Sequence, residues 1–496
     1  MNARRVAEAV LVVALAGLGS ASAVMDARQQ TGTQGAAGED QKPAAPPPGK
    51  KTENDDLGRI PTPQPPPDAE RAVSRNASQR VYVENAFTGS ARRRNLLVPV
   101  PQSTAATWQE RLFVDVRREW RAGRRLTLTF SDRVNMRAEH DLAFPSQQNV
   151  INDWREGFFS WEVFGDTYVD AGRINLKSGA ALGFNPTDFF KTRAVVEPLS
   201  SDPSVLREDR LGTLMLRAQR IWAGGAMTVA FAPAVSHMTP IYSDTNLPSV
   251  DPSFDRTNAC ARLFVKGSLN IAADFSPELL VYHEGDRTRF GLNITRGIGH
   301  NVVVYAEWAG GAEAGVIGDA MAYGRDTRVL RVGAPGVLPD NSVSRFREDL
   351  SVGGSLSTKP KLTINVEYHF HEAGFDRGDW ERWFTAGERT TSASPAARQL
   401  WFIRSYALDR QDPLTRHSLF ARADWVDAFT RHLELTAFVN MDMYDRSSLA
   451  QLTADYFASR KWTVGVQGSV NAGGARSDFG SLPQRGSLLF TLARYF

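Results

Sequence analysis

The stretch that decides the fold is Ser487-Leu488-Leu489-Phe490-Thr491-Leu492-Ala493-Arg494-Tyr495-Phe496. It has the pattern of a β-strand and ends on an aromatic residue. In a soluble domain a terminal apolar residue gains little, because chain ends fray in solvent. A strand that ends inside a closed sheet at a membrane interface can bury such a residue. We therefore expect an outer-membrane β-barrel, and the rest of the chain tests that expectation.

The N-terminal segment predicts export. Residues 1–23 combine a short basic start, an uncharged run and the small-residue exit Ala21-Ser22-Ala23. This pattern is typical of a cleaved secretory signal peptide. The alternative is a transmembrane anchor, but the uncharged run of about 15 residues is shorter than the roughly 18 to 20 that a spanning helix needs.

Composition agrees with a barrel and excludes several other classes. No second run of 18 apolar residues occurs, so helical membrane spanning is excluded. The mean hydropathy of −0.32 suits a sheet of which half faces a polar lumen. Cys260 is the single cysteine, so no internal disulfide forms. Loss of residues 1–23 would lower the net charge from +3 to +2, which is unlike a nucleic-acid-binding protein.

Residues 24–77 predict a disordered segment. They are rich in Gln, Gly, Ala, Lys and Asp and contain the proline clusters Pro46-Pro47-Pro48 and Pro65-Pro66-Pro67. Few apolar residues are present to bury, as in polyproline-type or disordered linkers. Two interpretations remain open: an inert spacer, or a periplasmic tether that contacts the cell wall or a partner.

From residue 78 onward, apolar and polar side chains alternate with period 2. One example places Leu433, Leu435, Ala437, Val439, Met441 and Met443 on one face and Glu434, Thr436, Phe438, Asn440 and Asp442 on the other. These runs last about 10 to 13 residues, near the length of a tilted membrane strand. Both signs of charge occur in mid-strand, which a wet lumen accepts and a packed sandwich core does not.

The pattern predicts eighteen strands, although sixteen are also consistent with it. We expect them at 80–89, 108–121, 124–136, 154–165, 166–176, 211–222, 225–234, 258–267, 270–284, 286–297, 300–310, 347–357, 361–372, 414–427, 431–444, 447–458, 460–471 and 485–496. The apolar piece 397–408 is assigned to a loop, because a single-chain barrel needs an even number of strands. The long connections 177–210, 235–257, 311–346, 373–413 and 472–484 then share one end, and the tight turns share the other.

Three short segments carry a family resemblance: Gly172-Arg173-Ile174-Asn175-Leu176-Lys177-Ser178-Gly179, Gly183-Phe184-Asn185-Pro186-Thr187-Asp188-Phe189-Phe190 and Arg207-Glu208-Asp209-Arg210-Leu211-Gly212. They resemble porin-like outer-membrane barrels, including those similar to alginate-export channels. The last strand also resembles the barrel-assembly signal, with Leu488, Phe490, Leu492 and Phe496 on one face. Arg494 departs from that signal, since an aromatic residue is usual there. The resemblance implies a channel and does not identify its solute.

The loop after residue 176 is the predicted constriction. Gly183 and Pro186 break strand pairing, and Asn185 and Asp188 are expected to cap a short helix through Phe189 and Phe190. A long loop with aromatic residues and paired charges is better folded into the barrel mouth than left in solvent. The alternative is a structured external lid without a role in selectivity.

The candidate pore-lining residues are those charged or amide side chains that the pattern places toward the lumen. They are Arg111, Asp115, Arg117, Arg133, Arg173, Asn185, Asp188, Arg207, Arg287, Arg289, Glu307, Glu367, Arg422 and Asp424; Arg125 is also placed inward. Rings of fixed charge set ion preference, and arginines clustered in the second and third strands would favour anionic solutes. The same charges could instead pair across neighbouring strands and hold the barrel's shape.

Two other kinds of site are weighed against the pore. Glu367, His369 and His371 share one strand face, and two histidines with a carboxylate can bind a metal; on a wet face they need no such role, and no metal site is predicted. His417-Ser418 could indicate a hydrolase, but adjacent strand residues point to opposite faces, which separates a nucleophile from its base.

The sequence therefore predicts an all-β protein: a transmembrane antiparallel up-and-down β-barrel of about 18 strands, spanning 78–496 after a disordered N-terminal segment. The expected function is passive passage or export of hydrophilic solutes, including anionic ones, across the outer membrane through a loop-constricted lumen. The alternatives are a structural or adhesive barrel plugged by its loops, and a barrel hydrolase. Expected partners are outer-membrane lipid and, through the strand ending at Phe496, the barrel-assembly machinery. Neither a cofactor nor a nucleic-acid partner is expected.

Overall fold

A computed structural model describes residues 79–101, 107–140, 150–195, 198–239, 251–272, 275–331, 333, 335–339 and 341–496. The predicted signal peptide (1–23) and linker (24–77) lie outside these ranges. Within them, no helix is both long enough and apolar enough to cross a membrane.

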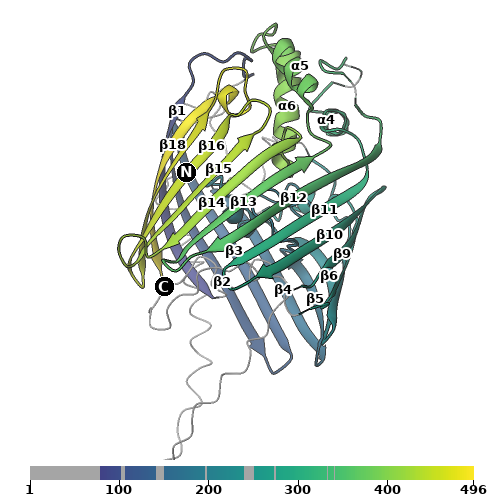
Figure 1. Cartoon of the computed structure of the whole chain (residues 1–496), viewed down its shortest axis with the longest axis vertical. Helices are drawn as coiled ribbons and strands as arrows, with labels where there is room; N and C mark the ends of the chain where they lie inside the picture. The colour runs from purple at the N-terminus through teal and green to yellow at the C-terminus, as the bar shows by residue number, and fades with distance from the viewer. Residues whose placement is uncertain are drawn as a thin grey trace, which may run out of the picture. The chain divides into compact units, whose positions relative to one another are not determined.

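Eighteen antiparallel strands form one closed barrel (Figure 1). Each strand pairs with its sequence neighbours, and β1 pairs with β18 to close the sheet, which confirms eighteen strands rather than sixteen. The strands are β1 Arg80–Arg92, β2 Trp108–Ala122, β3 Leu126–His140, β4 Val150–Phe164, β5 Thr167–Ile174, β6 Thr213–Trp222, β7 Gly225–Ala232, β8 Arg262–Leu269, β9 Glu278–Glu284, β10 Arg287–Ile298, β11 Val302–Glu313, β12 Arg345–Ser357, β13 Leu362–His371, β14 His417–Val426, β15 Leu433–Asp442, β16 Ser448–Ser459, β17 Trp462–Ala472 and β18 Gln484–Tyr495.

The long connections lie at one end of the barrel, here called the loop end, and the other end, the turn end, carries short connections (Figure 1). The short turns at 285–286 and 443–447 also lie at the loop end. This arrangement confirms that the long connections share one end. The helices belong to the long connections: α2 Pro203–Glu208, α3 Phe254–Thr257, α4 Val316–Asp326, α5 Arg377–Gly387, α6 Pro395–Arg410 and the 3₁₀ turn η3 Phe479–Ser481.

The segment 397–408, correctly left out of the sheet, is the body of helix α6. Pro395 occupies the first turn of that helix, and the Ser394 side chain accepts a hydrogen bond from the N–H of Ala397 at 3.0 Å. Proline at the first helical turn and a serine N-cap are strong helix starts. The sixteen-residue element is therefore set by its local start signal and not by its apolar content.

The barrel has its apolar side chains outside and its polar ones inside. On β18, Leu488, Phe490 and Leu492 are 45–47% exposed on the outer face. Inward side chains such as Asp115, Glu307 and Glu367 are no more than 1% exposed. A water-soluble protein would show the reverse, whereas a barrel in a bilayer needs this distribution. The shared outer face predicted for the last strand is confirmed.

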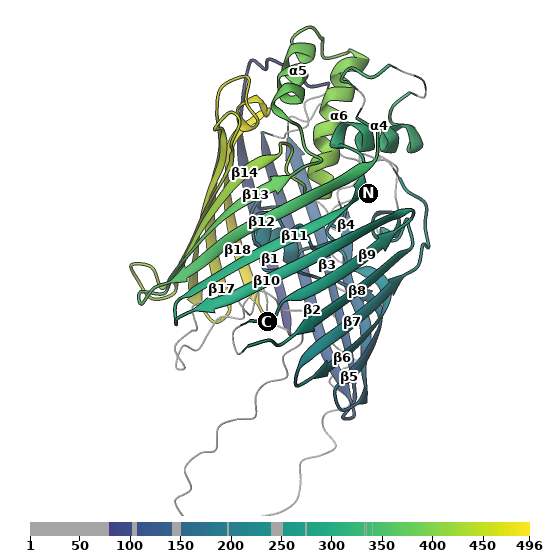
Figure 2. The same ribbon diagram turned by 45° about the vertical axis from the view of Figure 1, so that its right-hand side comes forward.

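Helices α4, α5 and α6 pack together at the loop end (Figure 2). Their shared core is aromatic: Trp380 and Trp383 stack with ring centroids 5.4 Å apart, and Trp383 is completely buried. The Arg404 guanidinium lies 5.3–5.7 Å from the ring centres of Trp380, Trp383 and Trp401. We call these three helices the cap.

Two strand predictions need correction. The predicted strand 270–284 begins only at Glu278, because Pro277 just before it lacks the N–H that a ladder requires. Arg125, expected on a lumen face, lies exposed in the turn between β2 and β3. The turn covers residues 123–125, where Gly123 has a φ of +70°, and β3 begins only at Leu126, two residues later than predicted.

Candidate functional site: the loop that crosses the lumen

The connection between β5 and β6, residues 175–212, lies inside the barrel. Its described residues contact inward-facing side chains of strands on opposite sides of the barrel. These side chains belong to the middle of their strands. Leu176, Ala181, Phe184 and Phe190 are buried although they belong to a loop. We call residues 175–212 the lumen loop. Its position agrees with a constriction and disagrees with an external lid.

Two buried carboxylates hold the first part of the lumen loop. Glu367 on β13 accepts hydrogen bonds from the backbone N–H groups of Leu182 at 2.7 Å and Gly183 at 2.8 Å. Glu307 on β11 accepts the N–H of Ala181 at 2.5 Å. These contacts therefore fix the loop backbone to one wall, and we call them the carboxylate clasp.

Aromatic packing anchors the next part of the loop. Phe189 stacks on Tyr282 of β9 with ring centroids 4.7 Å apart, and Phe190 meets Phe264 of β8 edge-on at 5.8 Å. Because Tyr282 and Phe264 point inward, they provide an apolar patch within a polar lumen. This patch explains why a loop in the lumen carries two consecutive phenylalanines.

Asp188 joins the two halves of the lumen loop. Its carboxylate lies 3.0 Å from a guanidinium nitrogen of Arg210 and 3.5 Å from one of Arg207. Arg207 also donates to the backbone oxygens of Ser178 and Gly179, both at 2.9 Å. The predicted helix through Phe189 and Phe190 does not form; turns occupy 186–193 instead. The Asp188 carboxylate pairs with these arginines and does not cap a helix.

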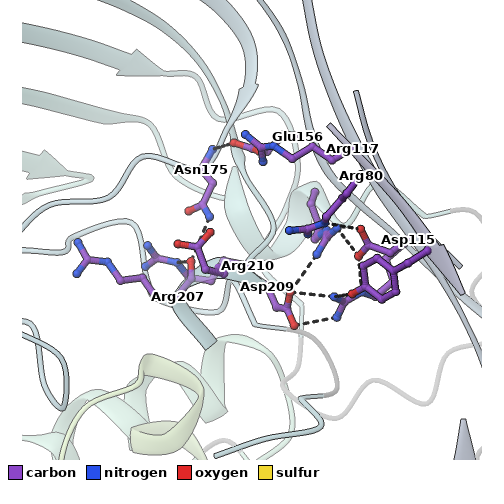
Figure 3. Close-up of polar contacts among 12 residues, drawn as sticks. Arg80, Asp115, Arg117, Glu156, Asn175, Arg207, Asp209 and Arg210 are labelled. Carbon is purple, nitrogen blue, oxygen red and sulfur yellow. Dashed lines mark hydrogen bonds and ion pairs between the residues drawn. The ribbon is translucent and has the colours of Figure 1, made fainter. Parts of the chain in front are cut away.

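The far part of the loop contacts the β1–β4 wall through a shared ion network (Figure 3). Asp115 of β2 accepts from Arg80 at 3.0 Å, Arg133 at 2.9 Å and Arg155 at 2.5 Å. Asp209 of the loop lies 2.8 Å from Arg133 and 3.0 Å from Arg155. Three guanidiniums thus share two carboxylates. Burial raises the pKa of Asp209, but Arg133 and Arg155 outweigh it, so the pKa lies below the ordinary aspartate value.

A third wall is reached through helix α2. Asp202 caps the helix by accepting the N–H of Ser204 at 2.9 Å, and it also pairs with Arg422 of β14. Arg422 is shared with Asp424 on the same strand at 2.7 Å. The lumen loop is therefore attached to β3–β4, β8–β9, β11, β13 and β14, and it spans the barrel.

Two small cavities flank the lumen loop. One, of about 40 Å³, lies between the loop and the β1–β3 and β16–β18 walls; it is lined by Arg133 and Asp209 and, across from them, by Asp455. The other, of about 60 Å³, lies between the loop and the β9–β12 wall and is lined by Lys191, Arg289 and further charged groups. Each has room for a few water molecules. Charged side chains of both signs face both cavities.

Of the predicted pore-lining residues, most lie at the lumen loop. Asn185, Asp188 and Arg207 belong to the loop, and side chains of Arg133, Glu307, Glu367 and Arg422 contact it directly. Asp115 is linked to the loop through Arg133 and Arg155. Arg117 pairs with Glu156, whose carboxylate accepts the N–H of Asn175 at 3.3 Å (Figure 3). Their effect on selectivity stays a prediction.

Other predicted residues lie away from this contact zone, except Arg173, which donates to Gly212 at the end of the lumen loop. Arg287, 44% exposed, pairs with Asp319 of the cap at 2.8 Å. Arg289 pairs with Asp349 at 2.5 Å on the wall beside the larger cavity. Arg173 is buried and donates to backbone oxygens of Gly212 and Pro252. Arg111 is buried on β2 and donates to Gln109 at 2.6 Å.

Sequence reasoning missed Arg80, Arg155, Asp202, Asp209 and Arg210. Arg155 was not predicted because the pairing of β3 with β4 contains a bulge. Ser131 pairs with Glu156 and Asp132 with Trp154, so Arg155 is the extra residue. A bulge shifts the alternation by one, so Arg155 and Glu156 are both buried. Asp209 and Arg210 belong to the segment Arg207–Gly212, which carries the family resemblance, and that resemblance could have identified them.

The structure brings no metal ligands together in its described residues. His369 contacts Glu367 at 2.8 Å, while His371 contacts Asp349 at 2.7 Å, so each histidine has a separate carboxylate. For the hydrolase alternative, Ser418 lies 3.3 Å from Nδ1 of His369 rather than beside His417. That order of serine, histidine and glutamate resembles a nucleophile and base, but neither lumen cavity reaches Ser418.

No protein-family model matches the sequence, and no curated protein matches it. Solved structures similar to the barrel include Pseudomonas aeruginosa OpdK, solved with vanillate, at a TM-score of 0.47 and 8% identity over 84% of this chain and 98% of OpdK. Pseudomonas aeruginosa OccK8 (OprE) has a TM-score of 0.46 and 9% identity over 84% and 97%. A mutant Rh. blastica porin has a TM-score of 0.37 and 9% identity over 84% and 99%.

Proposed function

We propose that this protein is an outer-membrane channel for small hydrophilic solutes and that the lumen loop controls passage. One observation supports this most directly: a polar, charged interior enclosed by an apolar exterior is crossed at mid-height by the lumen loop. An enclosed polar lumen lets hydrated solutes avoid the hydrocarbon core. A loop held at that height by named contacts restricts the path to the spaces at its sides.

The charge balance at the loop supports preferential passage of anionic solutes. Arg80, Arg133 and Arg155 share two carboxylates, while Arg207 and Arg210 share Asp188. In these two clusters five guanidiniums therefore face three carboxylates. Fixed positive charge in a narrow pore raises the local concentration of anions.

A second candidate function is supported by the size of the cavities. Spaces of about 40 and 60 Å³ beside the loop are too small for a sugar. A barrel closed by its own loop would act as a structural or adhesive protein of the outer membrane. The two candidates differ in whether the lumen loop leaves its anchors in a bilayer.

The proposal is tested by measuring the conductance of the refolded full chain in a planar bilayer. The same measurement is made on a variant in which a short glycine linker replaces residues 177–210. Trimming the turn-end connection 270–277 is the matched control, because it leaves the lumen loop in place. The channel proposal expects discrete ion conductance from the wild type, larger conductance from the loop variant and no change in the control. A wild type that stays closed while the loop variant conducts would support the plugged barrel.

A further inference from the structure

Arginine side chains gather on the outer face of the barrel at its turn end. Arg118 of β2 shares the outward face of Trp120, which is 48% exposed, near the turn that follows. Three other strands repeat the arrangement near the turn end: Arg220 lies beside Trp222 on β6, Arg296 beside Ile298 on β10, and Arg494 beside Phe496 on β18. On the same outer face at the loop end, β2 and β12 carry Glu110 and Glu348 instead.

One place at this end is hollowed. Ala122, Arg124, Arg125, Leu126, Phe159 and Trp161 line a groove on the outer surface beside the turn between β2 and β3. Its apolar floor is formed by Leu126, Phe159 and Trp161, which are 37–49% exposed and paired across β3 and β4. Two exposed arginines close its turn-side edge. We call this the arginine groove.

The two arginines of the groove, Arg124 and Arg125, and the nearby Arg118 have no ion-pair partner among the described residues, although Lys361 in another turn pairs with Asp427. Arg494 lies instead 5.0 and 5.4 Å from the rings of Phe496 and Trp462. The planar donor fork of a guanidinium fits a phosphate.

We propose that the arginine groove binds an anionic phospholipid of the surrounding leaflet. Arg124 and Arg125 hold the phosphate group, and Arg118 reaches it by extending its side chain along the surface toward the turn end. An acyl chain lies along Leu126, Phe159 and Trp161. The apolar floor selects a lipid over a free phosphate, because it continues the lipid-facing surface of β3 and β4. This binding is independent of transport.

Native mass spectrometry of the detergent-purified full chain tests the proposal with added phosphatidylglycerol and, separately, phosphatidylcholine. We expect the wild type to retain phosphatidylglycerol at activation energies that strip phosphatidylcholine. The variant R118Q/R124Q/R125Q should lose that preference. The matched control R220Q replaces a single outward arginine outside the groove and should keep it. The heat-sensitive shift in gel mobility checks that each variant is folded.

Glycerol phosphate distinguishes the two sources of phosphate, because it carries a phosphate without acyl chains. At millimolar concentration it should not displace the lipid from the wild type. Equal retention of both lipids by the wild type would overturn the proposal, as would unchanged preference in the folded triple variant. The single variants R124Q and R125Q, both in an exposed turn, keep the test valid if the triple variant does not fold.

Discussion

The carboxylate of Glu367, in the middle of β13, accepts a hydrogen bond from the backbone N–H of Gly183 in the lumen loop at 2.8 Å. A β-carbon at Gly183 would lie 2.5–2.6 Å from Phe420 and His369, so the loop approaches the wall at a distance that only glycine allows. The Tyr305 hydroxyl donates to the same carboxylate at 2.7 Å. Glu367 thus connects two strands with the loop, and the predictions begin there.

Replacing this carboxylate should free the loop. In E367Q the charged acceptor is lost, and charge-assisted hydrogen bonds of this kind contribute about 2 kcal/mol each. We expect larger and noisier single-channel currents from an otherwise intact barrel. E119Q is the control, because Glu119 lies on an inward face of β2 near the turn end. Identical current traces for wild type, E367Q and E119Q would show that the clasp does not control conductance.

Neutralising Arg133 should weaken anion preference. Arg133 lines the smaller cavity and balances both Asp115 and Asp209. Removing one charge at ~8 Å from a permeating ion in water changes its energy by about 0.5 kcal/mol, or about twofold in permeability. The reversal potential of R133Q in a potassium chloride gradient should shift toward cation selectivity. The reversal potential of R117Q/R133Q should shift further in the same direction. R347Q, away from the lumen loop, should leave the potential unchanged; an unchanged potential in R133Q contradicts the proposed anion preference.

The contact between the lumen loop and the segment after α6 should depend on pH. Asp412 lies 3.1 Å from Lys191 and 2.8 Å from Arg410. Burial raises the pKa of Asp412, but Lys191 and Arg410 outweigh it and hold the pKa well below the ordinary value of about 3.9.

Because the folded state holds this carboxylate ionised more tightly than the unfolded state does, its contribution is present above about pH 4. It is lost as pH falls through the lower folded pKa. The unfolding temperature of wild type minus that of D412N should therefore stay constant from pH 8 to about 4 and shrink below it. A difference that is zero at pH 7 would exclude a stabilising role for this contact.

Truncation of Trp383 should unfold the cap and spare the barrel. Burial of Trp383 is complete, and Trp→Ala changes in cores cost about 3–5 kcal/mol. We expect W383A to be cut by protease between 372 and 416 while keeping its heat-sensitive gel mobility. W222A, which removes a lipid-facing ring, should resist the protease; equal resistance of W383A would contradict a cooperatively packed cap.

Strand positions were predictable because the barrel imposes one rule on every strand. Each must alternate a lipid-facing and a lumen-facing side chain, as Val439 and Phe438 do with 41% and 3% exposure. Errors arose where backbone geometry breaks that rule. The bulge at Arg155 places an arginine inward, and the turn over residues 123–125 extends past the predicted strand start and leaves Arg125 exposed. Alternation in a sequence cannot show an extra unpaired residue.

The candidate site was predictable in composition but not in its connections. Asp115 and Arg133 were identified as inward charges from their strands alone. Arg133 pairs with Asp115 and also with Asp209, which is 76 residues away in the chain, and no local pattern relates Arg133 to Asp209. The same limit applies to the hydrogen bond from Leu182 to Glu367, which joins residues 185 apart. Contacts across a lumen depend on how a loop turns inside it, and that follows from packing.

The lumen loop also acts as an internal strut. It is tied to Arg133 of β3 through Asp209 and to Arg422 of β14 through Asp202. A hollow cylinder flattens easily under lateral pressure, whereas one with a cross-member transmits that load inward. Bilayer thickness and tension would then reach the narrowest part of the lumen mechanically, without any ligand.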